Sequence, residues 1–395
     1  MKPHQEASDT QTIQSPSSKI AALITTASPR HSNDSPLWQG PCGDGWNGGI
    51  TQSMIGKFLS CRERFRLRYV LGLENHDKWN HRMGYGNMWH VCEEAHAKNQ
   101  DWIGELADHF IQQANRYPFQ QEEINKWSNV CMTQFPEYIN YWSEHPDVKN
   151  RTPLLQEQVF DVPYTIPSGR VVRLRGRWDS VDLIDDGIYI QENKTKSDID
   201  KVQIERQMKF DLQTMLYLVA LQEGAVSSYL IQQGKYRGDR QAPIKGVRYN
   251  VIRRPLSGGK GNISPHKAKS TKTKYIPAET QEQFYERLRL DYFVKEPEYW
   301  FFRLKVEITP QDIEVFRKTC LDPLLECICD WYSYTVGDKE FATACYRTGH
   351  GLHYVTPFGI YNSLQEGGAT EYDSYLETGS EAGLRRTIEL FTELK

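Results

Sequence analysis

The sequence predicts an α/β fold with a mixed central sheet, a β-hairpin that carries the candidate site, flanking helices and a helical insertion. Three observations support this class. Apolar residues recur at helical spacing between residues 51 and 145, an alternating strand pattern follows from Leu154 to Thr195, and helical spacing returns after Val202. Helices before and after a cluster of strands are typical of layered α/β domains.

The overall composition is that of a folded protein. The 395 residues, 38% of them hydrophobic and 12% aromatic, can form a large core. No apolar run is long enough to cross a membrane, and the apolar stretch 20–24 lacks the basic segment that precedes a secretion signal. We therefore expect an intracellular, cytoplasmic protein.

Three regions are expected along the chain. Residues 1–45 are rich in Ser, Thr, Pro and Gln and poor in large apolar side chains, so we expect a disordered tail. Residues 46–365 are expected to form the main domain, with the helical insertion at about 100–150 and a basic band at 235–274. Residues 366–395 are expected to form a C-terminal extension.

The first predicted helix begins at Thr51 or Ser53, because either side chain can cap it, and it ends before Gly72, a residue suited to a helix C-terminus. A second helix is expected to begin near Asn87 and to run through His90.

The insertion is predicted to contain further helices. Pro118 and Pro136 should break them, because proline has no N–H to donate inside a helix. Downstream, the pattern predicts a long helix at 202–222, a strand at 247–252, and helices at 279–293 and 310–334.

The strand pattern contains a hairpin. Strands are expected at 158–162, 171–184 and 188–195. Asp185-Asp186-Gly187 predicts a tight turn between the last two. A turn at Asp186-Gly187 places Asp179 opposite Lys194, whereas a turn at Asp185-Asp186 places it opposite Glu192. Both registers put Asp179, Glu192 and Lys194 on one face, and a three-residue loop without a bulge would separate them.

Two carboxylates and an ammonium would then lie at the end of an otherwise apolar face. Buried charges are costly unless they pair or bind a metal, so one interpretation is a buried salt bridge among Asp179, Glu192 and Lys194. The other is a catalytic site, because two carboxylates can hold one or two hard divalent cations that activate water and neutralise charge on a phosphate. Lys194 would then orient the water and stabilise developing charge.

A basic band follows the hairpin. Between Lys235 and Lys274 there are twelve Lys or Arg and one acid, a balance of +11 in a chain of net charge −3, so the rest of the chain carries −14. Such a band either contacts a polyanion such as DNA or is a solvated loop. The candidate DNA contacts are Arg253 and Arg254, at the end of a predicted strand, and Lys267, Lys269, Lys272 and Lys274 in the looser run after them.

The segments Gly176-Arg177-Trp178-Asp179 and Glu192-Asn193-Lys194 resemble the G-x-x-D and E-x-K motifs of PD-(D/E)xK nucleases, in their RecB-like branch. Other segments resemble that branch in the same order along residues 50–360. Thr51 to Leu73 is similar to the leading helix of that branch, and Gly84 to Glu94 is similar to its Gly-rich turn and metal-binding histidine. Gln213 to Tyr217 is similar to its Q-x-x-x-Y helix. Val251 to Pro255 and Glu279 to Arg287 are similar to segments of phage-encoded relatives.

The resemblance implies a restriction-endonuclease-like core and a Mg²⁺- or Mn²⁺-dependent DNA nuclease, more an exonuclease than an endonuclease. It implies a role in DNA recombination, repair, or phage and defence DNA processing, with a recombination-complex protein as a further partner. By position, it implies catalysis by Asp179, Glu192 and Lys194, metal ligation by His90, Asp179 and Glu192, and support from Gln213 and Tyr217.

Other interpretations stay open. His90 could be an ordinary helix residue, Gln213 and Tyr217 could simply pack, and the position of Glu157 relative to the site is not readable from the sequence. The whole chain could be a catalytically silent DNA-binding subunit or a restriction-like defence endonuclease. Retention of both carboxylates and the lysine argues against a silent subunit.

The eight cysteines are scattered, without a CxxC pair, and do not suggest a disulfide scaffold. Some RecB-like nucleases bind an iron–sulfur cluster through four cysteines. Cys61 and Cys345 fit two of those positions, but residues 356–361 have no cysteine for the others. Cys320, Cys327 and Cys329 fit an apolar helix pattern and are expected in the core. We therefore expect no iron–sulfur cluster.

Overall fold

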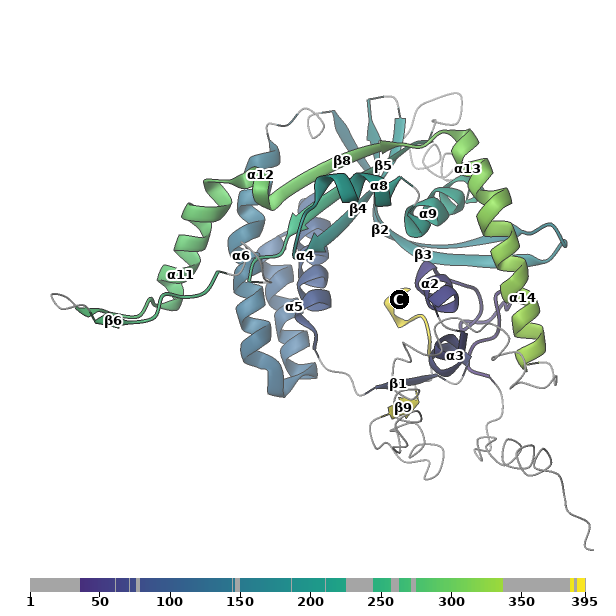
Figure 1. Cartoon of the computed structure of the whole chain (residues 1–395), viewed down its shortest axis with the longest axis horizontal. Helices are drawn as coiled ribbons and strands as arrows, with labels where there is room; N and C mark the ends of the chain where they lie inside the picture. Colours follow the sequence, from purple (N-terminus) through teal and green to yellow (C-terminus); the bar gives the residue numbers. More distant parts are fainter. Residues whose placement is uncertain are drawn as a thin grey trace, which may run out of the picture. The chain divides into compact units, whose positions relative to one another are not determined.

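A computed structural model of the chain describes residues 36–336 and 384–394, apart from gaps at 61, 71, 76–78, 144, 146–149, 186, 210, 225–243, 257–262, 271–274 and 387–388. Figure 1 shows a mixed α/β protein, which agrees with the predicted class. The chain forms two compact units. The first is drawn from residues 1–38, 57–76 and 330–390, and the second from 39–56, 77–329 and 391–395.

The first unit has an aromatic core. The Phe65 ring lies edge-on to the rings of Trp38, Phe58 and Trp331, with centroids 5.1, 5.4 and 5.4 Å away. The same unit contains a short antiparallel pair of strands, β1 (Leu73–Asn75) and β9 (Leu384–Arg386).

The leading helix begins and ends where the sequence predicts. The Thr51 hydroxyl accepts a hydrogen bond from the Met54 N–H at 3.4 Å, and α2 (Gln52–Ser60) follows. Two further helical segments, α3 (Arg62–Phe65) and η1 (Arg66–Val70), extend the run. Gly72, two residues after the end of η1, has a φ of 69°, a left-handed conformation that glycine adopts at little cost.

The second unit is built on a five-stranded sheet in the order β2-β3-β4-β5-β8. Its strands are β2 (Arg151–Thr165), β3 (Val171–Ile184), β4 (Gly187–Lys196), β5 (Ile244–Arg253) and β8 (Phe301–Glu307). The β4–β5 pair is parallel and the other three pairs are antiparallel, so the sheet is mixed, as predicted.

The β3–β4 hairpin adopts one of the two predicted registers. Ile184 lies opposite Gly187 and Ser180 lies opposite Gln191, which is the register of a turn at Asp185-Asp186. Asp185 has a φ of 54°, a left-handed conformation that aspartate tolerates better than most residues. This register points Asp179 toward Glu192.

Helices α4 (His81–Ala97), α5 (Trp102–Arg116) and α6 (Gln121–Ser143) pack together, and α4 also contacts β2 and β4 (Figure 1). The predicted start of α4 at Asn87 is wrong by six residues, because Asn80 caps the helix by accepting from the Arg82 N–H at 2.9 Å. The prediction of a break at Pro118 is confirmed by the short 3₁₀ segment η2 (Pro118–Gln120).

The prediction of a second break at Pro136 is wrong, since Pro136 lies inside α6. The neighbouring rings explain why the helix persists. Phe135 and Tyr138 both pack edge-on against Trp89 of α4, with centroids 5.2 and 5.1 Å away. This buried packing outweighs the backbone hydrogen bond that proline cannot donate.

The long helix predicted at 202–222 is two helices, α8 (Lys201–Met208) and α9 (Leu212–Glu223). Asp211 starts the second, because its side chain accepts from the Thr214 N–H at 3.1 Å and so caps a new helix. Helix α9 packs against β2, β3, β4 and β5.

The remaining described elements are β6 (Lys269–Ser270), β7 (Tyr275–Ile276), α11 (Gln281–Arg287), η4 (Leu288–Val294), α12 (Pro297–Trp300), α13 (Pro310–Phe316), η5 (Arg317–Leu321), α14 (Asp322–Val336) and η6 (Thr392–Leu394). Helices were predicted at 279–293 and 310–334 and are present in both regions, whereas β6, β7, β8, α12 and η6 were not predicted. Within the described ranges, no helix combines the length and apolar character needed to cross a membrane.

Part of the segment expected in the tail is attached to β3. The Arg173 guanidinium donates to the carbonyls of Gly43 and Gly45 at 2.8 Å each, and its backbone N–H donates to Pro41 at 2.9 Å. Residues 1–35 lie outside the described part of the chain.

Of the three cysteines expected in the core, Cys329 is buried, Cys327 is half-buried and Cys320 is exposed. The prediction for Cys320 is therefore wrong. It lies in the π-helical turn η5, which holds an extra residue per turn, so the side chain that reaches the core there is Leu321.

Candidate active site

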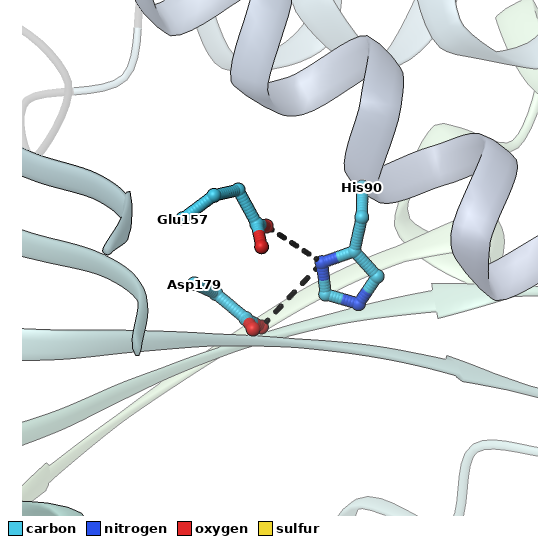
Figure 2. A group of neighbouring side chains, drawn as sticks. All are labelled: His90, Glu157 and Asp179. Carbon is cyan, nitrogen blue, oxygen red and sulfur yellow. Dashed lines mark hydrogen bonds and ion pairs between the residues drawn. The ribbon is translucent and has the colours of Figure 1, made fainter. Parts of the chain in front are cut away.

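Three side chains from three different elements meet in the second unit. His90 extends from α4, Glu157 from β2 and Asp179 from β3, and Figure 2 shows both carboxylates pointing toward the imidazole. His90 Nδ1 lies 3.1 Å from Glu157 Oε1 and 3.8 Å from Asp179 Oδ2. The potential ligand atoms all lie within 4.8 Å of one another. One ion could therefore contact all three residues.

Glu192 and Lys194 on β4 form a closed set of contacts with Gln213 of α9. Lys194 Nζ donates to Glu192 Oε1 at 2.6 Å and to Gln213 Oε1 at 2.8 Å. Gln213 Nε2 donates to the same Glu192 oxygen at 2.7 Å. The other oxygen, Glu192 Oε2, is buried and has no hydrogen-bond partner among the described residues. A buried oxygen left in this way needs a ligand that the protein itself does not supply.

Asp179 is fixed by the backbone of β4. The described β3–β4 pairing ends at Ser180 and Gln191, and beyond it the Asn193 N–H donates to Asp179 Oδ2 at 2.8 Å. The Asp179 carboxylate therefore accepts the Asn193 N–H, which could otherwise have donated to β3 if the two strands had stayed paired. This bond orients Asp179 toward His90.

Glu157 has an unusual backbone. Its φ is 45°, in the left-handed region that non-glycine residues seldom occupy, and its neighbours Gln156 and Gln158 remain paired with β3. Such a conformation costs on the order of 1 kcal/mol and persists only where the surroundings enforce it. The sequence left the place of Glu157 open, and no periodicity marks it, because a locally irregular strand does not follow the alternation rule.

Gly176 explains how α9 approaches the hairpin. A Cβ at this position would lie 2.6 Å from the Phe160 ring and 3.1 Å from the Tyr217 ring, so only glycine fits. The Tyr217 backbone carbonyl accepts a hydrogen bond from the Trp178 indole of β3 at 3.2 Å. The structure thus brings both predicted supporting residues, Gln213 and Tyr217, to the hairpin.

The opposite face of β4 carries a buried polar network. The Asn250 amide donates to Asn193 Oδ1 at 2.9 Å, to Glu93 Oε1 at 3.2 Å and to the Tyr138 hydroxyl at 2.6 Å. Asn250 is fully buried, and its partners come from β4, α4 and α6. The network thereby links the strand that carries Glu192 to the helix that carries His90.

Burial and neighbouring charges shift the pKa values of three groups in the site. Burial by itself lowers the pKa of His90, but Asp179 and Glu157 outweigh it and raise that pKa to about 9. Burial raises the pKa of Glu192 to about 7, the Asp179 charge adds to this effect, and Lys194 opposes it. Burial also raises the pKa of Asp179. A bound cation would stabilise the ionised form of these carboxylates and so lower their pKa values.

The sequence model of the PD-(D/E)XK nuclease superfamily matches residues 50–304, more than half of the chain. The chain belongs to this superfamily. A search of curated proteins found no match. Members of the superfamily are nucleases that use divalent metal ions, so membership identifies a metal-dependent nuclease in class and makes DNA the expected substrate.

The residues present fit the metal ion that the PD-(D/E)XK superfamily uses. Carboxylate oxygens suit hard divalent cations, an imidazole nitrogen can join them, and Glu192 Oε2 is the buried oxygen without a partner. His90, Glu157, Asp179 and Glu192 are the residues that would hold the ion.

Gly84 and Gly86 were expected in a Gly-rich turn, which is wrong, because both lie inside α4. A Cβ at Gly84 would lie 2.4 Å from the Trp79 indole, and one at Gly86 would lie 3.4 Å from Thr195 Oγ1. Only Gly84 therefore requires the absence of a side chain, against Trp79, whereas a Cβ at Gly86 would lie at ordinary contact distance from Thr195 of β4.

The strand part of the basic band is mostly internal. Arg253 is 6% exposed, lies 2.7 Å from Asp198 and stacks over the Tyr299 ring at 4.0 Å. Arg254 is 5% exposed, and burial with the nearby Arg82 charge lowers its pKa. The structure thus places Arg253 in a structural ion pair rather than on an open DNA-binding surface.

The looser part of the band is described only in part. Lys267 and Lys269 are exposed, and Lys269 lies on β6 of the hairpin that projects past α11 in Figure 1. Lys272 and Lys274 lie outside the described residues, as do Cys61 and Cys345, so the predictions for them stay predictions.

Proposed function

We propose that this chain is a Mg²⁺- or Mn²⁺-dependent deoxyribonuclease that acts as an exonuclease. His90, Asp179 and Glu192 would bind the metal, with Glu157 as a further ligand. The observation that supports this most is the buried Oε2 of Glu192, which lacks a protein partner beside three side chains suited to a divalent ion. The choice of exonuclease rests on the resemblance to the RecB-like branch.

The reaction is hydrolysis of a phosphodiester: a water oxygen bonds to phosphorus while the bond to the leaving sugar oxygen breaks. A bound divalent ion would lower the pKa of that water and neutralise charge on the phosphate. Lys194 would orient the water and stabilise the charge that builds on the phosphate oxygens. Gln213 would keep Lys194 in place through the bond between Oε1 and Nζ.

DNA would reach the site past the exposed part of the basic band. Lys267 and Lys269, with Lys272 and Lys274, would contact phosphates without reading sequence. The buried positions of Arg253 and Arg254 remove both of them from this proposed set.

The test is digestion of end-labelled linear and circular DNA with and without Mg²⁺. Asp179→Ala and Glu192→Ala should each abolish metal-dependent cleavage, whereas Glu314→Ala should not. Glu314 is an acid 47% exposed that pairs with Lys318, and it serves as the matched control. Resistance of the circle would support the exonuclease. Full activity of either site variant would refute the assignment, and nicking of the circle would indicate an endonuclease.

A further inference from the structure

Arg177 is the only exposed residue of β3 beyond the first position of that strand. It precedes Asp179 by two residues and therefore lies on the same face of β3. Its side chain is 44% exposed, against 26% for Lys194, 31% for His90 and 12% or less for the three carboxylates. Of these charged groups, Arg177 is thus the one most open to an approaching molecule.

The contacts of Glu157 place Arg177 beside the candidate metal ligands. One oxygen, Oε1, lies 3.1 Å from His90 Nδ1, and the other, Oε2, lies 3.2 Å from Arg177 Nε. The carboxylate therefore lies between the half-buried imidazole and the exposed guanidinium. Arg177 already contacts an oxyanion at the outer side of the site.

We infer that Arg177 binds a phosphate group of the nucleic-acid strand that enters the site. A guanidinium offers five N–H donors in a planar fork that matches phosphate oxygens, and Arg177 approaches Glu157 through Nε. An ammonium is a point charge without this geometry. The inference rests on the proposed function, since it names a contact for the substrate of that same site.

Lys194 is less suited to this first contact. Its Nζ already donates to Glu192 and Gln213, and it is held inside the site. Arg177 would thus hold the strand while Lys194 acts on the reacting water.

The experiment measures DNA binding in chelator, where cleavage cannot occur. Binding of a fluorescent oligonucleotide is followed by anisotropy at several salt concentrations, for the wild type, Arg177→Ala, Arg177→Lys and Lys318→Ala. Lys318 is 71% exposed and lines a surface pocket with Pro163 and Thr165, which lie at least six residues along β2 from Glu157. Lys318→Ala therefore controls for the loss of one positive charge away from the candidate site. Circular dichroism verifies folding of each variant.

Arg177→Ala should weaken metal-free binding about tenfold at low salt and reduce the log–log salt slope by about 0.7 to 0.9. Arg177→Lys should recover part of the affinity, because it restores the charge but not the fork. With Mg²⁺ added, Arg177→Ala should raise KM more than it lowers kcat. If Arg177→Ala binds DNA as Lys318→Ala does, while the wild type binds and cleaves DNA, the inference is overturned and the proposed function stands. A wild type that neither binds nor cleaves DNA overturns both.

Discussion

Replacing Glu192 with glutamine should stabilise the metal-free protein at alkaline pH while removing its activity. The folded state raises the pKa of Glu192 from 4.5 to about 7, so it binds the proton more tightly than the unfolded chain does. The stabilising contribution of the protonated Glu192 carboxyl is therefore fully present below pH 4.5 and is lost as the pH rises through 7. Ionisation then places a second buried carboxylate charge beside Asp179, which Lys194 offsets only in part. Glutamine imitates the protonated, neutral side chain at every pH.

The magnitude follows from the same shift. A rise from 4.5 to about 7 corresponds to about 3 kcal/mol, at about 1.4 kcal/mol for each pKa unit, and Glu192 is buried, so solvent screening removes little of it. In chelator at pH 8.5, Glu192→Gln should unfold with a free energy about 3 kcal/mol above that of the wild type. At pH 5 the difference should fall to about 1 kcal/mol or less.

Urea denaturation in EDTA at both pH values measures this difference. Glu314→Gln is the control, because Lys318 lowers the pKa of that exposed acid and its removal should bring no gain at pH 8.5. With Mg²⁺ added, the wild type should become more stable than Glu192→Gln, because the ion binds the folded wild type more tightly than the folded variant. A variant less stable than the wild type at pH 8.5, or a difference equal at both pH values, would refute the argument that the buried Glu192 charge destabilises the metal-free protein.

Three further predictions test other side chains. Lys194→Ala should lower kcat by about 10²- to 10³-fold. The Mg²⁺ concentration that gives half-maximal activity should change little, since Lys194 is not a proposed metal ligand. An equal loss of metal affinity in titrations would contradict this prediction. The affinity of the wild type for the metal ion should rise with pH up to about 9, because below that pH the ion must displace the proton on His90. Calorimetry at several pH values measures this, and His90→Gln should show a weaker pH dependence of the affinity. Arg253→Ala should lose about 1 to 3 kcal/mol of stability in urea without changing the salt slope of DNA binding, and a flatter slope would return Arg253 to the DNA surface.

Much of the fold could be predicted because the local signals and the packing agree. The alternating residues of the hairpin mark β3 and β4, and Gly72 ends the leading helix where its conformational freedom is needed. The errors arise where distant contacts override local preference. Pro136 stays inside α6 because rings from another helix pack beside it, and α8 separates from α9 because Asp211 caps a second helix.

The site was less readable from the sequence than the fold. Asp179, Glu192 and Lys194 share a face by strand alternation alone, so their proximity could be predicted. Glu157 could not be placed, because its left-handed backbone departs from that alternation. The burial of Arg253 was also hidden, since a run of positive charge in a sequence does not reveal which members have partners within the fold.

The polar network around Asn250 has a consequence for the evolutionary history of this protein. Glu93, Tyr138 and Asn193 all accept from the Asn250 amide, so replacing Asn250 with an apolar residue takes a donor from these buried acceptors at a cost of about 1 to 3 kcal/mol. A single substitution would therefore be removed by selection, whereas a compensating pair would survive. In an alignment of relatives, the positions of Glu93, Tyr138, Asn193 and Asn250 should covary as a group, even though none of these side chains is proposed to touch the substrate.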